Sequence, residues 1–228
     1  MMGTRGTAFW ELYYSDSLFN DEKYLVNADF LEWEEGNFDM LRNAKMIGAG
    51  SPASQVKLGG IGSSGTYNTY GFAGFNNAGD EGIISMRNPD TVAKELVFTL
   101  NEGVGCTSNG TYHVVLDHVY TEKGKKAAEA PKTVQFGQKV SITLQPGETQ
   151  IWHLSKDGDT VAPTLSKLYT ENNTTMRVQA SEHVYGAQFE VYIDGKKVEL
   201  GEDAIKAYAD LKTFDITLPS APADGVTV

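Results

Sequence analysis

The chain has little cysteine, an excess of acidic over basic residues and no long apolar segment. Its single cysteine, Cys106, excludes an intrachain disulfide and a zinc site built from cysteine pairs. The formal net charge of −11 argues against nucleic acid as a partner, because such surfaces need clustered Lys and Arg. No apolar run reaches the length of a membrane span, so we expect no membrane insertion.

Recognised metal, cofactor and nucleotide motifs are also missing. None of the four histidines has the HExxH or His-x-His spacing of a metal site. Asp157-Gly-Asp159 and Asp194-Gly195 could suggest calcium, but they lack the EF-hand spacing and are better explained as turns. The sequence therefore predicts neither a metal ion nor a cofactor.

The central part of the chain has the pattern of antiparallel strands. Short apolar alternations are separated by turns of Gly, Pro and Asn, and the chain contains 24 glycines. We predict seven strands, near residues 67–75, 81–87, 94–100, 111–120, 132–136, 138–145 and 148–155. Seven strands at this spacing predict a mainly β protein with an antiparallel β-sandwich domain at residues 56–156.

The first 50 residues have a different pattern. Aromatic residues between 6 and 15 predict a buried strand, and residues 18–46 predict an amphipathic helix that Gly36 kinks or divides. Glu32, Glu34 and Glu35 are expected to face away from the protein. We expect this strand–helix segment, residues 1–50, to pack on the sandwich through four apolar side chains: Leu25, Leu31, Phe38 and Leu41.

The last part of the chain, residues 160–228, predicts a second and smaller β-domain. Strands are expected at 164–169, 174–180, 189–193 and 214–218, a helical turn at 204–209, and a hairpin turn at Asp194-Gly195. An immunoglobulin-like sandwich needs about 100 residues. We therefore expect this domain to be Ig-like and incomplete.

Four short segments carry a resemblance to a known family: Gly6–Ser15, Leu41–Lys45, Gly82–Pro89 and Leu144–Thr149. Together they resemble the C-terminal part of bacterial α-galactosidase-like and endo-α-N-acetylgalactosaminidase-like glycoside hydrolases, in which a (β/α)8 barrel precedes an all-β domain. The resemblance implies that residues 6–15 and 17–47 match the last barrel strand and helix. It further implies an accessory sandwich at 56–156 and an Ig-like or cadherin-like repeat at 160–228.

The resemblance brings no catalytic pair with it. Retaining glycosidases of this kind need two carboxylates about 5–5.5 Å apart. Glu11 is the only carboxylate of the one barrel-like strand, and a structural role is favoured for it. We therefore predict no catalytic residue in this chain.

The candidate carbohydrate-binding residues are four aromatic residues with glycines between them: Tyr67, Tyr70, Phe72 and Phe75. Core packing, or an interface with a catalytic barrel, is the alternative for this group. Trp33 and Trp152 are assigned to core packing because they lie within the predicted helix and the last sandwich strand.

Two functions from different classes follow. The favoured one is the non-catalytic C-terminal part of a secreted carbohydrate-degrading enzyme, located outside the cell or on its surface, which supports the catalytic barrel or contacts glycans. The first residues carry no signal peptide, so the location rests on the resemblance. The alternative is a stand-alone carbohydrate-binding or cell-surface adhesion module.

Overall fold

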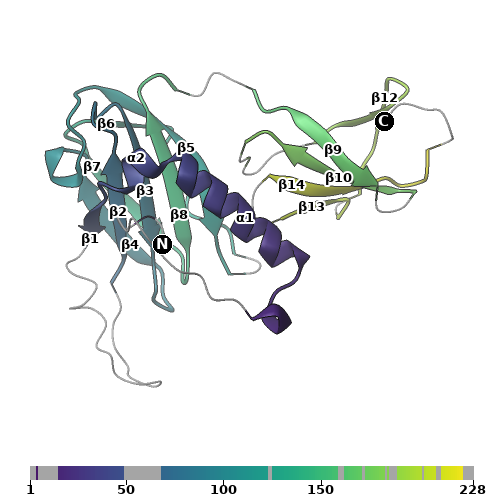
Figure 1. Cartoon of the computed structure of the whole chain (residues 1–228), viewed down its shortest axis with the longest axis horizontal. Coiled ribbons are helices and arrows are strands. Elements are labelled where there is room, and N and C mark those ends of the chain that lie inside the picture. Colours follow the sequence, from purple (N-terminus) through teal and green to yellow (C-terminus); the bar gives the residue numbers. More distant parts are fainter. Residues whose placement is uncertain are drawn as a thin grey trace. The chain divides into compact units, whose positions relative to one another are not determined.

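The structure is a computed structural model that describes residues 4, 15–48, 68–122, 125–158, 162–170, 173–182, 184, 189–201, 203–208 and 212–222 (Figure 1). The described part is mainly β, with antiparallel sheets that follow an N-terminal helix. The chain divides into two compact units. The first consists of residues 1–19 and 27–160, and the second of residues 20–26 and 161–228.

The helical segment is shorter than predicted, and a strand follows it. A 3₁₀ turn at Asp16–Leu18 precedes α1 (Asp21–Gly36), and α2 (Phe38–Leu41) follows after one residue. The prediction that Gly36 divides the helix is therefore confirmed. The expectation of helix as far as residue 46 was wrong, because β1 (Lys45–Gly48) pairs with β2 (Tyr70–Phe75).

A curled six-stranded antiparallel sheet dominates the first unit. Its order is β1-β2-β3-β8-β5-β6, so β8 (Thr149–Ser155) lies between β3 (Glu81–Arg87) and β5 (Thr111–Tyr120), and β6 (Thr133–Gln135) forms an edge. Strands β4 (Lys94–Thr99) and β7 (Lys139–Leu144) pair separately, with the 3₁₀ turn Glu102–Val104 after β4. All seven strands predicted between residues 67 and 155 are confirmed, with ends shifted by up to three residues.

The main core lies between the six-stranded sheet and the β4–β7 pair. Every second residue of β7 is buried, which is the alternation that the sequence shows. We call the core side of the six-stranded sheet its inner face and the opposite side its outer face. The inner face and the β4–β7 pair contribute fully or nearly fully buried side chains: Ile84, Met86, Leu96, Phe98, Val140, Ile142, Leu144, Trp152 and Leu154.

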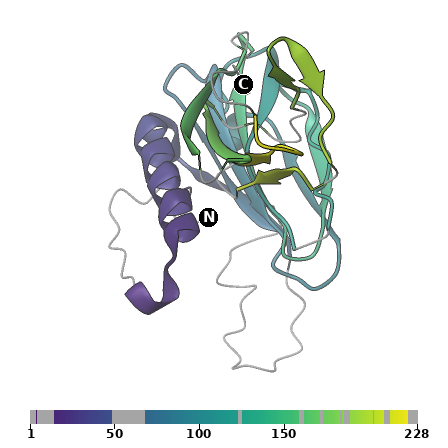
Figure 2. The ribbon, with the colours of Figure 1, turned by 90° about the vertical axis from the view of Figure 1, so that its right-hand side faces the viewer.

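The helices cover part of the outer face, as Figures 1 and 2 show for α1. A second apolar cluster joins them to β3 and β8: Phe30, Trp33, Met40, Leu41, Ile83 and Ile151. The predicted packing residues were therefore partly wrong. Leu41 is buried, but Leu31 and Phe38 are 37% and 40% exposed. The helix turns Phe30 and Trp33 to the sheet, and Leu31 lies about 100° round the helix from Phe30.

Gly74 allows α2 to lie close to β2, and it supports a stability prediction. A Cβ atom at Gly74 would lie 2.2 Å from the carbonyl oxygen of Met40, a backbone atom that cannot rotate away. We expect Gly74→Ala to lower the free energy of unfolding of the first unit by about 1–3 kcal/mol. Urea denaturation followed by tryptophan fluorescence measures this loss. Gly36→Ala is the matched control, because the same atom there meets nothing within 4 Å; equal stability of both variants would contradict the prediction.

The second unit has a four-stranded antiparallel sheet and a hairpin. The sheet has the order β13-β14-β10-β9, from β9 (Leu165–Thr170), β10 (Thr175–Ala180), β13 (Ile205–Ala207) and β14 (Thr213–Thr217). The hairpin joins β11 (Val191–Ile193) to β12 (Lys196–Val198). These elements enclose one apolar core, whose buried members are Val178, Ala180, Val191, Phe214, Ile216 and Leu218.

Two local predictions for the second unit have opposite outcomes. Asp194 and Gly195 have φ values of 47° and 74°, so the predicted Asp-Gly hairpin turn is confirmed. The predicted helical turn at 204–209 was wrong, because Ile205 pairs with Ile216 across β13 and β14. That pairing depends on a strand further along the chain, which the local pattern does not reveal.

Candidate functional site

Several carboxylate and histidine side chains lie on the outer face, where α1 crosses β3, β8 and β5 (Figure 1). The pairing of β5 with β8 shifts register between Leu116 and His118, which is a β-bulge. Strict alternation would send Asp117 and His118 to opposite faces, but both contact α1. The indole Nε1 of Trp33 donates to Asp117 Oδ2 at 2.8 Å, and the ring of His118 lies edge-on to Trp33 at 5.1 Å.

Two histidines at this place have carboxylate neighbours. Nε2 of His118 lies 3.6 Å from Oδ2 of Asp29 on α1, and both side chains are largely buried. His153 of β8 lies between two carboxylates. Its Nε2 is 2.7 Å from Glu81 Oε1, and its Nδ1 is 3.9 Å from Asp117 Oδ2. Each of these contacts is an ion pair only when its histidine is protonated.

Glu34 lies on α1, next in sequence to Trp33, and was wrongly predicted to face away from the protein. It is 3% exposed, and neither carboxylate oxygen has a hydrogen-bond partner among the described residues. Burial of a carboxylate without a partner disfavours its charged form. Burial therefore raises the pKa of Glu34 to about 7.

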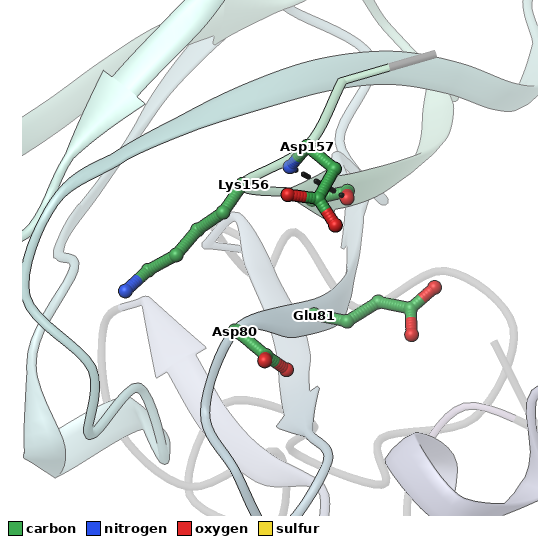
Figure 3. Close-up of a pocket in the computed structure, with 5 residues that line it drawn as sticks. Asp80, Glu81, Lys156 and Asp157 are labelled. Atoms are coloured by element: carbon green, nitrogen blue, oxygen red, sulfur yellow. Dashed lines mark hydrogen bonds between the residues drawn. The ribbon is translucent and has the colours of Figure 1, made fainter. Parts of the chain in front are cut away.

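An open polar pocket of about 330 Å³ lies at the adjoining ends of β3 and β8 (Figure 3). Its lining residues are Asp80, Glu81, Ser155, Lys156 and Asp157. Figure 3 shows the Lys156 side chain pointing away from the carboxylates, and its ammonium group donates to Asn109 O at 2.6 Å and to Ser108 Oγ. The pocket is therefore acidic in character. Within the part of the chain that the structure describes, no group of three His, Cys, Asp or Glu side chains is arranged to hold a metal ion.

The single cysteine is not placed for chemistry. Cys106 is fully buried in the main core, and its Sγ lies 3.3 Å from the hydroxyl oxygen of Tyr112. Burial raises the pKa of the Cys106 thiol and also that of the Tyr112 hydroxyl. A thiol with a raised pKa is a poor nucleophile at neutral pH.

The predicted aromatic group is split between the two faces of the sheet. Tyr70 and Phe72 alternate with Ala73 and Phe75 along β2, so they lie on the outer face, partly exposed. Their rings meet edge to face, with centroids 6.3 Å apart. Phe75 is 2% exposed and packs on Tyr112 in the main core.

Other residues singled out from the sequence have clear positions or lie outside the described ranges. Trp33 is 8% exposed and Trp152 is fully buried, so their assignment to core packing is confirmed. Tyr67, Glu11 and the strand predicted at 6–15, except Ser15, fall outside the described residues. Sequence reasoning missed the roles of Asp117 and His118, because a two-residue alternation gives no sign of the bulge.

Comparisons with known proteins identify no relative. No protein-family model matches the chain, and no match was found among curated proteins or solved structures. Within the described ranges, no helix is both long and apolar enough to span a membrane. What the fold itself defines is a mainly β protein in which an N-terminal helix precedes antiparallel sheets.

Proposed function

We propose that the chain is a non-catalytic accessory part of a secreted carbohydrate-degrading enzyme, and that it contacts a glycan through Tyr70 and Phe72. The observation that supports this contact is the position of two partly exposed aromatic rings on one face of β2. Aromatic rings offer a large apolar surface at low entropic cost, and the Tyr70 hydroxyl adds a polar group at its edge. A pyranose ring, with apolar C–H faces and a polar rim, suits such a surface.

The neighbours of the two rings complete this surface. Arg87 stands opposite Tyr70 in the pairing of β2 with β3, and Arg87 is exposed. Its guanidinium group can donate hydrogen bonds to sugar hydroxyls. Met46 of β1 stands opposite Phe72 and is 40% exposed, so it extends the apolar area. We call Met46, Tyr70, Phe72 and Arg87 the β2 patch.

The proposal includes a finer description of the fold. In it, the first unit is a β-sandwich, since the six-stranded sheet and the β4–β7 pair share one core. The second unit is an Ig-like sandwich, since its four-stranded sheet and the β11–β12 hairpin also share a core. This order of an accessory sandwich followed by an Ig-like repeat is what the resemblance to barrel hydrolases implies.

The same resemblance gives α1 a supporting role. In the proposal α1 is the last helix of a catalytic barrel and holds that barrel on the accessory sandwich. Its firm attachment to the sheet supports this role, because Trp33 joins the apolar contact with Ile83 and Ile151 and also donates to Asp117. A catalytic domain is therefore the second partner that we propose, beside the glycan.

A binding experiment tests the glycan contact. We expect the chain to bind immobilised mucin-type O-glycans or α-galactosides on a glycan array, and Tyr70→Ala or Phe72→Ala to weaken binding about tenfold. Loss of one stacked ring removes about 1–1.5 kcal/mol, and 1.4 kcal/mol corresponds to a factor of ten. Tyr120→Ala is the matched control. Tyr120 is 63% exposed, and it lies on β5, which is separated from β2 by β3 and β8 in the sheet.

Two outcomes would contradict the proposal. Binding that Tyr70→Ala and Phe72→Ala leave unchanged, or no binding to any glycan of the array, would contradict the β2 patch as a glycan site. Release of the aryl group from an aryl α-galactoside or α-N-acetylgalactosaminide by the chain would contradict the non-catalytic role. Circular dichroism of each variant establishes that it is folded before its binding is compared.

A further inference from the structure

We infer that Asn109 is a site of spontaneous deamidation, and that the ammonium group of Lys156 promotes the reaction. Asn109 precedes Gly110 in the loop that leads into β5, and both residues are exposed. This pair is the only Asn-Gly sequence in the chain. The reaction converts the side-chain amide of asparagine to a carboxylate, and water is its only other reactant.

The first step of the reaction takes place between neighbouring residues, so the two reacting groups are already close together. The backbone nitrogen of Gly110 loses its proton to solvent and attacks Cγ of Asn109, which closes a five-membered succinimide ring. The bond from Cγ to the side-chain nitrogen breaks, and this nitrogen takes up a proton and leaves as ammonia. Water then opens the ring at either of its two carbonyl carbons. One opening gives aspartate, and the other gives isoaspartate, in which the main chain runs through Cγ.

Gly110 has a backbone nitrogen that is accessible for this attack. It has no side chain, and its φ of 132° is a conformation that other residues rarely adopt. Among the described residues, no acceptor is present for the Gly110 N–H, and no hydrogen bond holds the side-chain amide of Asn109. The ring can therefore close without the loss of a hydrogen bond by either reacting group.

Lys156 places a positive charge at the peptide group that must lose a proton. Its Nζ donates to the carbonyl oxygen of Asn109 at 2.6 Å and also to Ser108 Oγ, and it lies 5.6 Å from the centre of the Tyr112 ring. Loss of the Gly110 proton spreads negative charge over the nitrogen and this carbonyl oxygen, because the peptide bond is a resonance system. A hydrogen bond from a cation favours the charged form. Lys156 therefore increases the fraction of Gly110 nitrogen that is ready to attack.

The product changes the surroundings of the polar pocket that Lys156 helps to line. Deamidation places a negative charge on a residue that Lys156 contacts. Isoaspartate also adds one main-chain atom between two anchored carbonyl groups. The carbonyl oxygen of Ser108 accepts from the Tyr112 hydroxyl at 2.6 Å, and that of Gly110 accepts from the Phe136 N–H at 2.9 Å. The modification therefore alters both the charge and the backbone of this loop.

Incubation of the full chain tests the inference. The purified protein is kept at mildly alkaline pH and digested at intervals under acidic conditions, and mass spectrometry follows the peptide that contains Asn109. We expect its mass to rise by the difference between OH and NH₂. Electron-transfer fragmentation should identify isoaspartate, which direct hydrolysis of the amide does not form. Asn77 is the reference in the same sample and should stay intact, since it is exposed but precedes Ala78, whose side chain hinders the attack.

Variants separate the role of Lys156 from that of the Asn-Gly sequence. Lys156→Met removes the charge, and we expect deamidation to be about tenfold slower, an effect of the size that one hydrogen bond from a charged donor can cause. Lys156→Arg keeps a charged donor and should retain a rate close to that of the wild type. Asn109→Gln should abolish the mass change, because ring closure by glutamine needs a less favourable six-membered ring. Circular dichroism establishes that each variant is folded.

Three results would overturn the inference. The first is an unchanged Asn109 in the folded chain over the time in which a synthetic peptide of residues 104–114 deamidates completely. The second is a product that contains aspartate but no isoaspartate. The third is deamidation of folded Lys156→Met at the wild-type rate or faster, since a faster rate would show that Lys156 only restrains the loop.

Discussion

Trp152→Ala is expected to lower the free energy of unfolding of the first unit by about 3–5 kcal/mol. Trp152 is fully buried on β8, the strand between β3 and β5, and it packs in the main core. Its indole Nε1 donates to Gln150 Oε1 at 2.7 Å. The alanine variant therefore leaves both a large cavity and a buried amide oxygen that has lost its donor.

Urea denaturation followed by far-UV circular dichroism measures this loss. Tyr120→Ala is the control, since it removes an aromatic ring that is 63% exposed, and we expect it to change stability by less than about 0.5 kcal/mol. If the alanine variant does not fold, Trp152→Phe provides the test, because a phenyl ring refills part of the space and should cost less. A Trp152 variant as stable as the Tyr120 variant would contradict the prediction.

Glu148→Ala is expected to have a similar effect for a different reason. Glu148 is fully buried immediately before β8, and both oxygens of its carboxylate accept hydrogen bonds. Oε1 accepts from the backbone N–H of Ala128 at 2.9 Å and from Gln150 Nε2 at 2.6 Å, while Oε2 accepts from the Gln145 N–H at 2.6 Å. Removal of the carboxylate leaves these donors unsatisfied, at a cost of about 3–5 kcal/mol in total.

Thermal and urea unfolding measure this second loss, and two further variants define its cause. Glu148→Gln retains an acceptor oxygen but turns an NH₂ group toward a donor, so an intermediate loss is expected. Glu129→Ala removes an exposed carboxylate from the segment that Glu148 holds, and it should be nearly neutral. A Glu148→Ala variant within about 0.5 kcal/mol of Glu129→Ala would show that the network does not stabilise the fold.

Two of the four segments that carry the resemblance to barrel hydrolases, Gly82–Pro89 and Leu144–Thr149, meet at this network. Asn88 is the last residue but one of Gly82–Pro89, and its Nδ2 donates at 3.0 Å each to the carbonyl oxygens of Leu144 and Gln145, the first two residues of Leu144–Thr149. The N–H of Asn88 also donates to the carbonyl oxygen of Glu148 at 2.9 Å. The two short motifs are therefore one structural unit that fixes the start of β8 beside the end of β3. Their role in this chain is structural, which is why they carry little information about a substrate.

The candidate glycan site was only partly readable from the sequence. Aromatic residues with glycines between them indicate a candidate site on β2. The two-residue period of a strand places Phe75 on the face opposite to Tyr70 and Phe72. That period assigns Phe75 to the other face, but it does not say which face is the core. The structure decides this, because Ala73 and Phe75 join the main core.

The polar contacts between α1 and the sheet could not be read from the sequence. Glu34 stands among other acidic residues of an exposed-looking helix, and only the fold shows that it is buried while Glu35 is not. Asp117 and His118 reach α1 together only because β5 has a bulge against β8. The position of Asp117 beside α1 depends on contacts between distant residues, such as the hydrogen bond from Trp33 to Asp117.

The sequence by itself determined the seven strands between residues 67 and 155, the Asp194-Gly195 turn and the division of the helix at Gly36. These features follow from local rules, namely the alternation of buried residues along β7, the conformational needs of the Asp194-Gly195 turn and the low helix propensity of glycine. Only the tertiary structure decided that residues 45–48 and 205–207 are strands, that Glu34 is buried and that Asp117 faces α1. The reason is physical, since a strand needs a partner for its hydrogen bonds, and burial needs a surface that comes from a distant part of the chain.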